Sequence, residues 1–204
     1  MPRPYAHPAR VGDSGGLGAP LIRLWGGGPR HTPSQLGMHR NDGFEVTMLL
    51  EGSVRWEVSN GPVFDLAGGD VCVMLPGVLH RGENDIIAPS HLLWAVFDPR
   101  FPGATGNTPF TEADLRSMDR RLRAAGNIVF RAPEALVRAA HVWEAARDTF
   151  RRDEEADRTM MRSTLGLFLW TLAEAVAAPG VVRKSEETRR AVTFIDAHLP
   201  EPIG

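Results

Sequence analysis

Residues 44–77 read FEVTMLLEGSVRWEVSNGPVFDLAGGDVCVMLPG, and this stretch decides the expected fold. Short apolar runs alternate there with turn signals, which are Glu51-Gly52, Asn60-Gly61, Gly68-Gly69 and Pro76-Gly77. Asn60-Gly61 is a specific hairpin signal, because both residues tolerate a positive φ. A further apolar run follows at residues 92–97. Several short strands joined by Gly and Pro turns predict an antiparallel sandwich or barrel.

Beyond residue 98 the spacing of apolar residues changes from strand-like to helical. Helices are expected from Thr111, from Pro133 and over residues 154–178. The third helix is apolar nearly all round, and such a helix must be buried on two sides. We predict that one side packs within the domain and the other forms a homodimer seam; a fully internal helix is the alternative. The predicted dimerisation residues are Met161, Leu165, Phe168, Leu169 and Leu172.

The composition is that of an ordinary globular protein, with 204 residues, 43% apolar and 24% charged. These values exclude the disordered and fibrous classes. The formal net charge of −2 lacks the basic excess of nucleic-acid-binding domains, so the chain is not expected to hold DNA by itself. No signal peptide and no run of ~18 apolar residues is visible, which favours a cytoplasmic protein without a membrane partner. Cys72 is the only cysteine, so no internal disulfide is expected.

Two polar stretches carry the candidate chemistry. The positions of His39, Asn41 and Glu45 differ by two and by four, and His80 follows shortly after Gly77. Positions of one parity share a face of a continuous strand. We therefore expect the first three side chains to point into one cavity, which His80 joins from a neighbouring strand. Two imidazoles and one carboxylate are a ligand set that suits Fe(II), Mn(II) or Zn(II).

These stretches resemble the two sequence motifs of the cupin family. The matching positions are His39, Glu45 and Gly52 in the first motif, and Gly69, Gly77, His80 and Asn84 in the second. Asn41 replaces the second histidine of the first motif. Three interpretations of the site stay open: a metal-free ligand pocket, a divalent transition metal held by His39, Glu45 and His80, and hydrogen-bonded histidines of the core or rim. We predict the metal-free pocket, without a cofactor.

The order of parts is similar to that of the AraC-type transcription regulators. In that family a cupin sensor barrel precedes antiparallel dimerisation helices and a helix-turn-helix DNA-binding domain. Residues 191–203 are similar to the opening of that last domain. The resemblance implies an α+β chain with a mobile arm at 1–19, a cupin-like barrel at 20–98, a loop and dimerisation helices at 99–180, and a linker with the first helix of a truncated DNA-binding domain at 181–204. It implies effector sensing and homodimerisation, with DNA contacted only through the missing domain.

In such a barrel the inward-facing side chains would contact a small-molecule effector. The candidates are His39, Glu45, Thr47, Trp56, His80 and Trp94. Arg23, on an expected short first strand at 21–25, is a candidate partner for an anionic effector. The alternative function is a small metal-dependent cupin enzyme, an oxygenase or isomerase, and a free-standing binding module is a third. No catalytic residue is assigned, because no second acidic residue is clearly placed near a metal.

Overall fold

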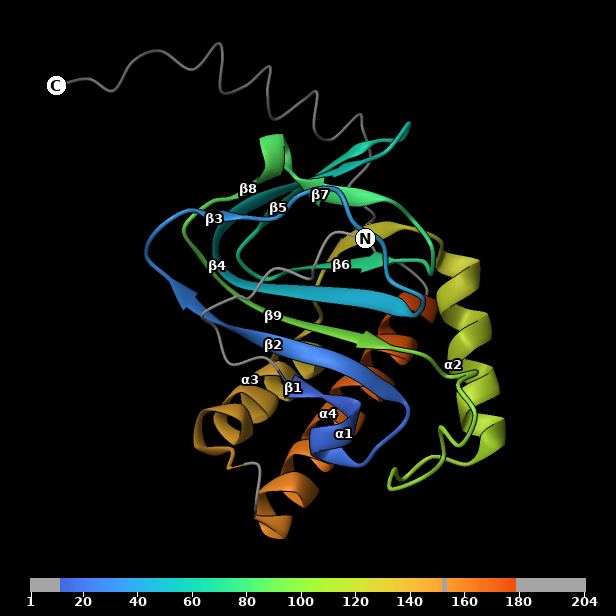
Figure 1. The fold of residues 1–204 in the computed structure, drawn as a ribbon. Helices are drawn as coiled ribbons and strands as arrows, with labels where there is room; N and C mark the ends of the chain where they lie inside the picture. Colours follow the sequence, from blue (N-terminus) through green and yellow to red (C-terminus); the bar gives the residue numbers. More distant parts are fainter. Residues whose placement is uncertain (1–11, 152–153, 179–204) are drawn as a thin grey trace, which may run out of the picture.

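The computed structural model describes residues 12–151 and 154–178. A strongly curved antiparallel sheet lies over helices α3 (Glu134–Thr149) and α4 (Glu155–Ala177), and α2 (Glu112–Ala125) stands along one side (Figure 1). The short α1 (Ser14–Leu17) packs near α4. The first eleven residues of the expected arm, and the linker and helix expected at 181–204, lie outside the described residues.

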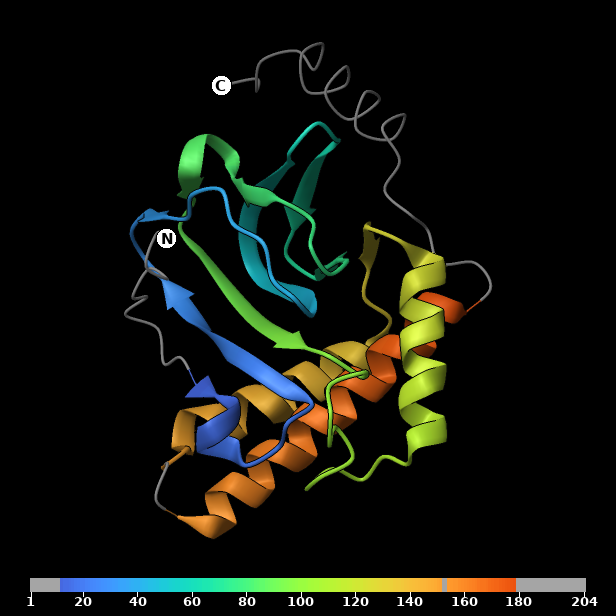
Figure 2. The same ribbon diagram turned by 45° about the vertical axis from the view of Figure 1, so that its right-hand side comes forward.

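The main sheet has the strand order β1-β2-β9-β4-β6-β10, and all of its pairings are antiparallel. Its strands are β1 (Gly12–Asp13), β2 (Ile22–Arg30), β4 (Phe44–Val58), β6 (Asp70–Met74), β9 (Ser90–Phe97) and β10 (Ile128–Arg131). The first half of β4 pairs with β6 and β9, and its second half pairs with β5 (Val63–Ala67) and β7 (His80–Gly82). One long strand thus runs from one sheet into the next, and a barrel-like wall results (Figure 2). A small sheet of β3 (Ser34–Gln35) and β8 (Ile86–Ile87) lies beside it, and a 3-10 turn η1 (Glu83–Asp85) precedes β8.

The antiparallel sheet predicted from residues 44–97 is confirmed, and two strands go beyond the prediction. β2 does not end at residue 25 but continues through three glycines to Arg30. Gly26 has a reason to lack a side chain, because a Cβ there would lie 2.9 Å from the indole of Trp94. β10 was not predicted at all, since it is a four-residue strand between two helices. It pairs with β6 and so extends the sheet at that edge.

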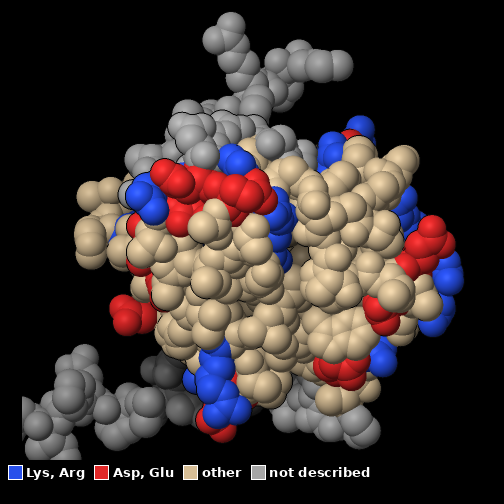
Figure 3. All heavy atoms as spheres, turned by 90° about the horizontal axis from the view of Figure 1, so that it is seen from below, with Lys and Arg blue, Asp and Glu red and all other residues tan. Residues whose placement is uncertain are grey.

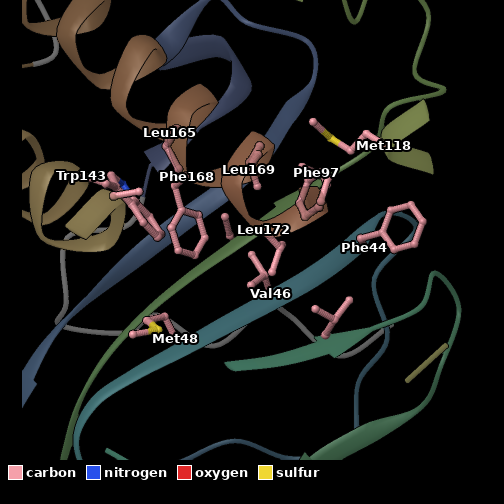
Figure 4. Packing of buried hydrophobic residues seen from close by; sticks show 14 of the residues in the cluster. Phe44, Val46, Met48, Phe97, Met118, Trp143, Leu165, Phe168, Leu169 and Leu172 are labelled. Atoms are coloured by element: carbon pink, nitrogen blue, oxygen red, sulfur yellow. The ribbon is translucent and has the colours of Figure 1, made fainter. Parts of the chain in front are cut away.

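The two faces of β9 enter different apolar clusters. Leu93, Ala95 and Phe97 belong to the cluster that includes the buried faces of the helices, which we call the helix-side core. Leu92 and Trp94 alternate with them and belong to a second cluster inside the barrel wall. Figure 4 shows side chains of the helix-side core between α4 and the strands. This alternation, two residues per repeat, lets one strand face helices on one side and the barrel interior on the other.

The apolar stripe of α4 lies inside the single chain. Met161, Leu165, Phe168, Leu169 and Leu172 are all 0% exposed, because the sheet, α2 and α3 cover them together. The assignment of these five side chains to a subunit seam is therefore corrected: they are core residues, as the internal-helix alternative had it. The exposed apolar side chains of α4 are others, Met160 and Leu167, at 57% and 50%. That the helices form a dimerisation region stays a prediction.

The helix boundaries follow the expected signals. Thr111 caps α2: its hydroxyl accepts a hydrogen bond from the Asp114 backbone N–H at 3.2 Å, and its own N–H donates to the Asp114 carboxylate at 2.8 Å. Helix α3 begins one residue later than expected, because Pro133 is its N-cap and not its first helical residue. No helix in the described ranges combines the length and hydropathy that crossing a bilayer needs.

Candidate functional site

The barrel wall encloses a cavity of about 480 Å³. Its lining is mainly apolar, with Leu24, Leu36, Ile87, Leu92 and Val96 among the contributors together with Trp56 and Trp94. Its polar lining residues include His39, Asn41, Glu45 and Thr47, and two arginines, Arg30 and Arg40. Of the six predicted effector-binding residues, five therefore line one cavity. The sixth, His80, is 3% exposed and reaches the site through its contact with Glu45.

One carboxylate oxygen organises the polar end of the cavity. Glu45 Oε2 accepts a hydrogen bond from Asn41 Nδ2 at 2.6 Å and another from His80 Nε2 at 2.9 Å. His39 Nε2 stands 3.7 Å from the same oxygen. We call these four residues the Glu45 cluster. Because a buried carboxylate needs partners, the cluster forms a polar group that is satisfied without a ligand.

The Glu45 cluster is assembled differently from the sequence prediction. Residues 41–43 are not in a strand and β4 begins at Phe44, so His39 and Glu45 do not share a continuous strand. His39 instead pairs with His80 in an isolated antiparallel bridge, in which each backbone N–H donates to the other residue's carbonyl at 2.9 Å. The four residues converge as predicted, but they come from separate segments of the chain and not from one continuous strand.

Hydrogen bonds set the charge of Glu45 and His80. Burial alone would raise the pKa of Glu45, but its interactions with His39 and His80 outweigh burial and lower that pKa to about 2. Burial would lower the pKa of His80, but the hydrogen bond and charge of Glu45 and the Val78 carbonyl raise it. His80 Nδ1 lies 3.0 Å from that carbonyl, so both ring nitrogens face acceptors. Both nitrogens donate only in the imidazolium form, and the pair is therefore a carboxylate beside a cation.

The same geometry fits a divalent metal ion. His39 Nδ1 lies 2.9 Å from the Gly37 carbonyl, just as His80 Nδ1 lies beside that of Val78. Such contacts orient each ring so that Nε2 faces the Glu45 cluster, and on His80 a metal ion would replace the proton that Nε2 donates to Glu45. Ligand atoms of His39, Glu45 and His80 all lie within 4.8 Å of one another. Asn41 stands where the cupin motif has a further histidine, and its amide hydrogen goes to Glu45.

Sequence reasoning chose the wrong arginine. The guanidinium of Arg23 lies over the ring of Phe101, 3.8 Å from its centroid, and Arg23 does not line the cavity. Arg30, seven residues further along β2, does line it. The signal was hidden because the glycine run at 26–28 marked the end of the expected strand. Once β2 is known to continue to Arg30, its pairing with β9 places that residue beside the barrel.

A second depression, of about 540 Å³, lies between the loop at residues 99–105 and α2. Its buried acidic group is Asp119, whose carboxylate accepts hydrogen bonds from Arg100 at 2.6 Å and from Arg123 at 2.9 Å. The Asp119 carboxylate is thus fully paired within the protein. None of the predicted site residues lines it, and we assign the candidate site to the barrel cavity.

Comparison with known proteins gives one family. The sequence model described as "AraC-like ligand binding domain" matches residues 29–159. No curated protein sequence matches the chain. The solved structures that are similar include the AraC-like transcriptional activator CuxR, at 14% identity and a TM-score of 0.47, over 85% of this chain and 59% of that one. They also include Bacillus subtilis oxalate decarboxylase (21%, 0.36, 52% and 26%) and Escherichia coli YhaK (14%, 0.33, 44% and 44%). The chain thus spans less than two thirds of the length of each of these proteins.

Proposed function

This chain belongs to the family of AraC-like ligand-binding domains, and from that premise we propose that it binds a small-molecule effector and thereby controls transcription. The barrel cavity carries the proposal, because apolar walls with a few converging polar groups are typical of small-molecule sites. In this proposal DNA is read by a separate helix-turn-helix domain of the regulator. The effector acts by population shift, and can move the equilibrium only as far as its affinities for the two arrangements differ.

The polar end of the cavity supports binding. Asn41 and His80 hold the Glu45 carboxylate in one orientation through hydrogen bonds to Oε2, so the carboxylate is preorganised to accept a further hydrogen bond from a ligand. Thr47, on the same face of β4, adds a hydroxyl to the lining, and Trp94 adds a broad apolar wall that lies against Gly26. We assign these residues to recognition and orientation of the effector.

A thermal-shift screen with a matched pair of variants tests the proposal. A compound that binds the native state raises the melting temperature by mass action. We expect Trp94→Ala to abolish that shift, because it removes a wall of the cavity. Trp170→Ala is the control, since Trp170 is also partly exposed but stacks on Phe110 away from the cavity. A binder whose shift survives Trp94→Ala would place the ligand elsewhere and contradict the proposal.

A second candidate function, a metal-dependent cupin enzyme of the oxygenase or isomerase type, is favoured by the orientation of the two histidines. His39, Glu45 and His80 would hold the metal, which when bound supplies Lewis-acid or redox chemistry. Elemental analysis of protein purified without a nickel column tests it: a stoichiometric transition metal supports the enzyme, and its absence leaves the metal-free sensor. Asn41→His restores the fourth motif position and should raise metal affinity if the site binds metal at all.

We further propose that the regulator pairs through the exposed side of α3 and α4. Met160, Leu167 and, on α3, Val142 are exposed apolar side chains. The face that carries these helices shows large uncharged areas with charged side chains mainly toward its margins (Figure 3). Sedimentation equilibrium should give a dimer for the wild type and for Arg116→Glu on α2, and a monomer for Leu167→Glu. A monomeric wild type at micromolar concentration would contradict pairing.

A further inference from the structure

The cavity contains a half-buried charged side chain, Arg30, whose charge no other described residue balances. Arg30 lines the cavity and forms no ion pair with an acidic group of the described chain. Its Nη1 donates to the Ser34 hydroxyl, and its Nε is buried without a hydrogen-bond partner. Other half-buried arginines differ: Arg55 donates to Asp65 at 2.6 Å, and Arg81 to Glu57 at 2.6 Å.

Arg30 and Glu45 lie at opposite ends of the cavity wall. In the sheet register Arg30 is opposite Ser90 of β9, whereas Glu45 is opposite Val96. Six residues of extended strand separate these two positions, which is roughly 20 Å measured along β9, and no ion pair joins Arg30 to Glu45. The negative charge of Glu45 therefore does not neutralise Arg30. The hydrogen-bond partners of Glu45, which are Asn41 and His80, lie at the Glu45 end of the cavity.

The wall between the two ends is apolar. Leu92 and Trp94 are the cavity-facing residues of β9 between Ser90 and Val96, and Leu36, Ile87 and Trp56 line the cavity as well. A ligand that fills this space needs a hydrocarbon body, because the wall offers it little to hydrogen-bond. The charged group at one end of the ligand has to be an anion, because the protein group at that end of the cavity is the Arg30 cation.

Burial makes the unbalanced charge costly. Desolvation lowers the pKa of the Arg30 guanidinium from its ordinary value, which means that the charged form is disfavoured there. A carboxylate in the cavity would accept charge-assisted hydrogen bonds from the terminal nitrogens of the guanidinium.

Starting from the proposed effector-binding function, we infer that the effector is a hydrophobic monocarboxylic acid. Its carboxylate binds Arg30, and its apolar body lies along Leu92 and Trp94 toward the Glu45 cluster. A single guanidinium matches a single carboxylate. Arg40 is the other cationic group of the lining, and it is exposed at the rim.

Matched acid and amide probes test this inference. The pairs are 3-phenylpropanoate with 3-phenylpropanamide, and octanoate with octanamide; glucose serves as an uncharged polar compound. Calorimetric titration should show that at least one acid binds about 10- to 100-fold more tightly than its amide, the range expected for hydrogen bonds to a charged group. Arg30→Met should remove that preference, and Arg30→Lys should keep part of it.

Arg23→Met is the matched control, because it changes the same residue type on the same strand outside the cavity. Arg30→Met removes no ion pair within the described chain, so its melting temperature without ligand should stay near that of the wild type. If Arg30→Met does not fold, Arg30→Gln takes its place, because glutamine keeps a hydrogen-bond donor for Ser34.

The outcomes separate the inference from the function on which it rests. Equal binding of acid and amide, an acid preference that survives in Arg30→Met, or binding of glucose alone overturns the carboxylate inference. In each of these cases the proposed function survives if binding is lost in Trp94→Ala. If no compound of either class binds, the acid inference fails, and the wider thermal-shift screen then decides whether the cavity binds an effector at all.

Discussion

The two faces of the main sheet use the same strands but are filled differently. On the helix side, Met48 and Phe97 lie in one apolar cluster with Phe168 of α4 (Figure 4). On the other side, Glu45 and Trp94 border a cavity of about 480 Å³. One face is thus a packed core and the other a container. The comparison implies that stability depends mainly on the first face and ligand recognition on the second.

The largest effect is expected on the helix side. Phe168→Ala removes a ring that is 0% exposed, and should lower the free energy of unfolding by about 4 kcal/mol. Ligand affinity of the folded variant should not change, because Phe168 does not line the cavity. Urea unfolding measures the first and calorimetry the second. The control is Arg116→Ala on the exposed side of α2, which should change stability by no more than about 0.5 kcal/mol. Equal losses for both variants would contradict the packing described for α4.

On the container side, the next largest effect is expected at Glu45. Glu45→Gln removes the charge that His80 faces, and should cost about 2 kcal/mol of unfolding free energy. Glu57→Gln is the control: Glu57 pairs with Arg81 on the outside, where such pairs contribute less than about 1 kcal/mol. If the two variants were equally stable, the buried Glu45–His80 pair would contribute no more to the free energy of unfolding than an exposed pair. The polar end of the cavity would then be a solvated rim.

The pH dependence of that difference sharpens the comparison. Glu45 has a folded pKa of about 2, below its ordinary 4.5, so its contribution is present above pH 4.5 and is lost as the pH falls toward 2. His80 has a raised pKa, so its contribution is complete below its ordinary 6.5 and is lost as the pH rises through the folded value. The stability gap between wild type and Glu45→Gln should therefore be widest at roughly pH 4.5 to 6.5. A gap that keeps growing above this window would contradict the ion pair.

Much of the container was predictable from local patterns. The turn pairs between residues 44 and 77 predicted the strands, and the motif positions predicted that His39, Glu45 and His80 converge. Pattern alone did not locate β10, because a four-residue apolar run between helices has no periodicity to measure. It also missed Arg30, because the run of three glycines at 26–28 was interpreted as the end of a strand, whereas Gly26 provides room for Trp94 within β2.

The covering of α4 was the harder question. Its apolar residues predicted burial on two sides, which the structure confirms, but periodicity does not say which molecule covers a face. The distinction between a core and a subunit seam depends on long-range packing of α2, α3 and the sheet around α4. Met160 and Leu167, which stay exposed, differ from their buried neighbours only in the direction that packing gives them.

The smallest predicted effect compares adjacent residues on the two faces of β6. Val73 belongs to the helix-side core and Cys72 to the cluster inside the barrel wall. Val73→Ala should lower the free energy of unfolding by about 2 kcal/mol, and Cys72→Ala by about 1 kcal/mol, because the helix side is filled more completely. Burial, with the charge of Glu45, raises the pKa of the Cys72 thiol, so a disulfide reagent should label it only after unfolding. Rapid labelling of the native protein would mean that the barrel side is the more mobile face. A greater loss of stability for Cys72→Ala than for Val73→Ala would mean that the barrel side is the more tightly packed face, and would contradict the assignment of the packed core to the helix side.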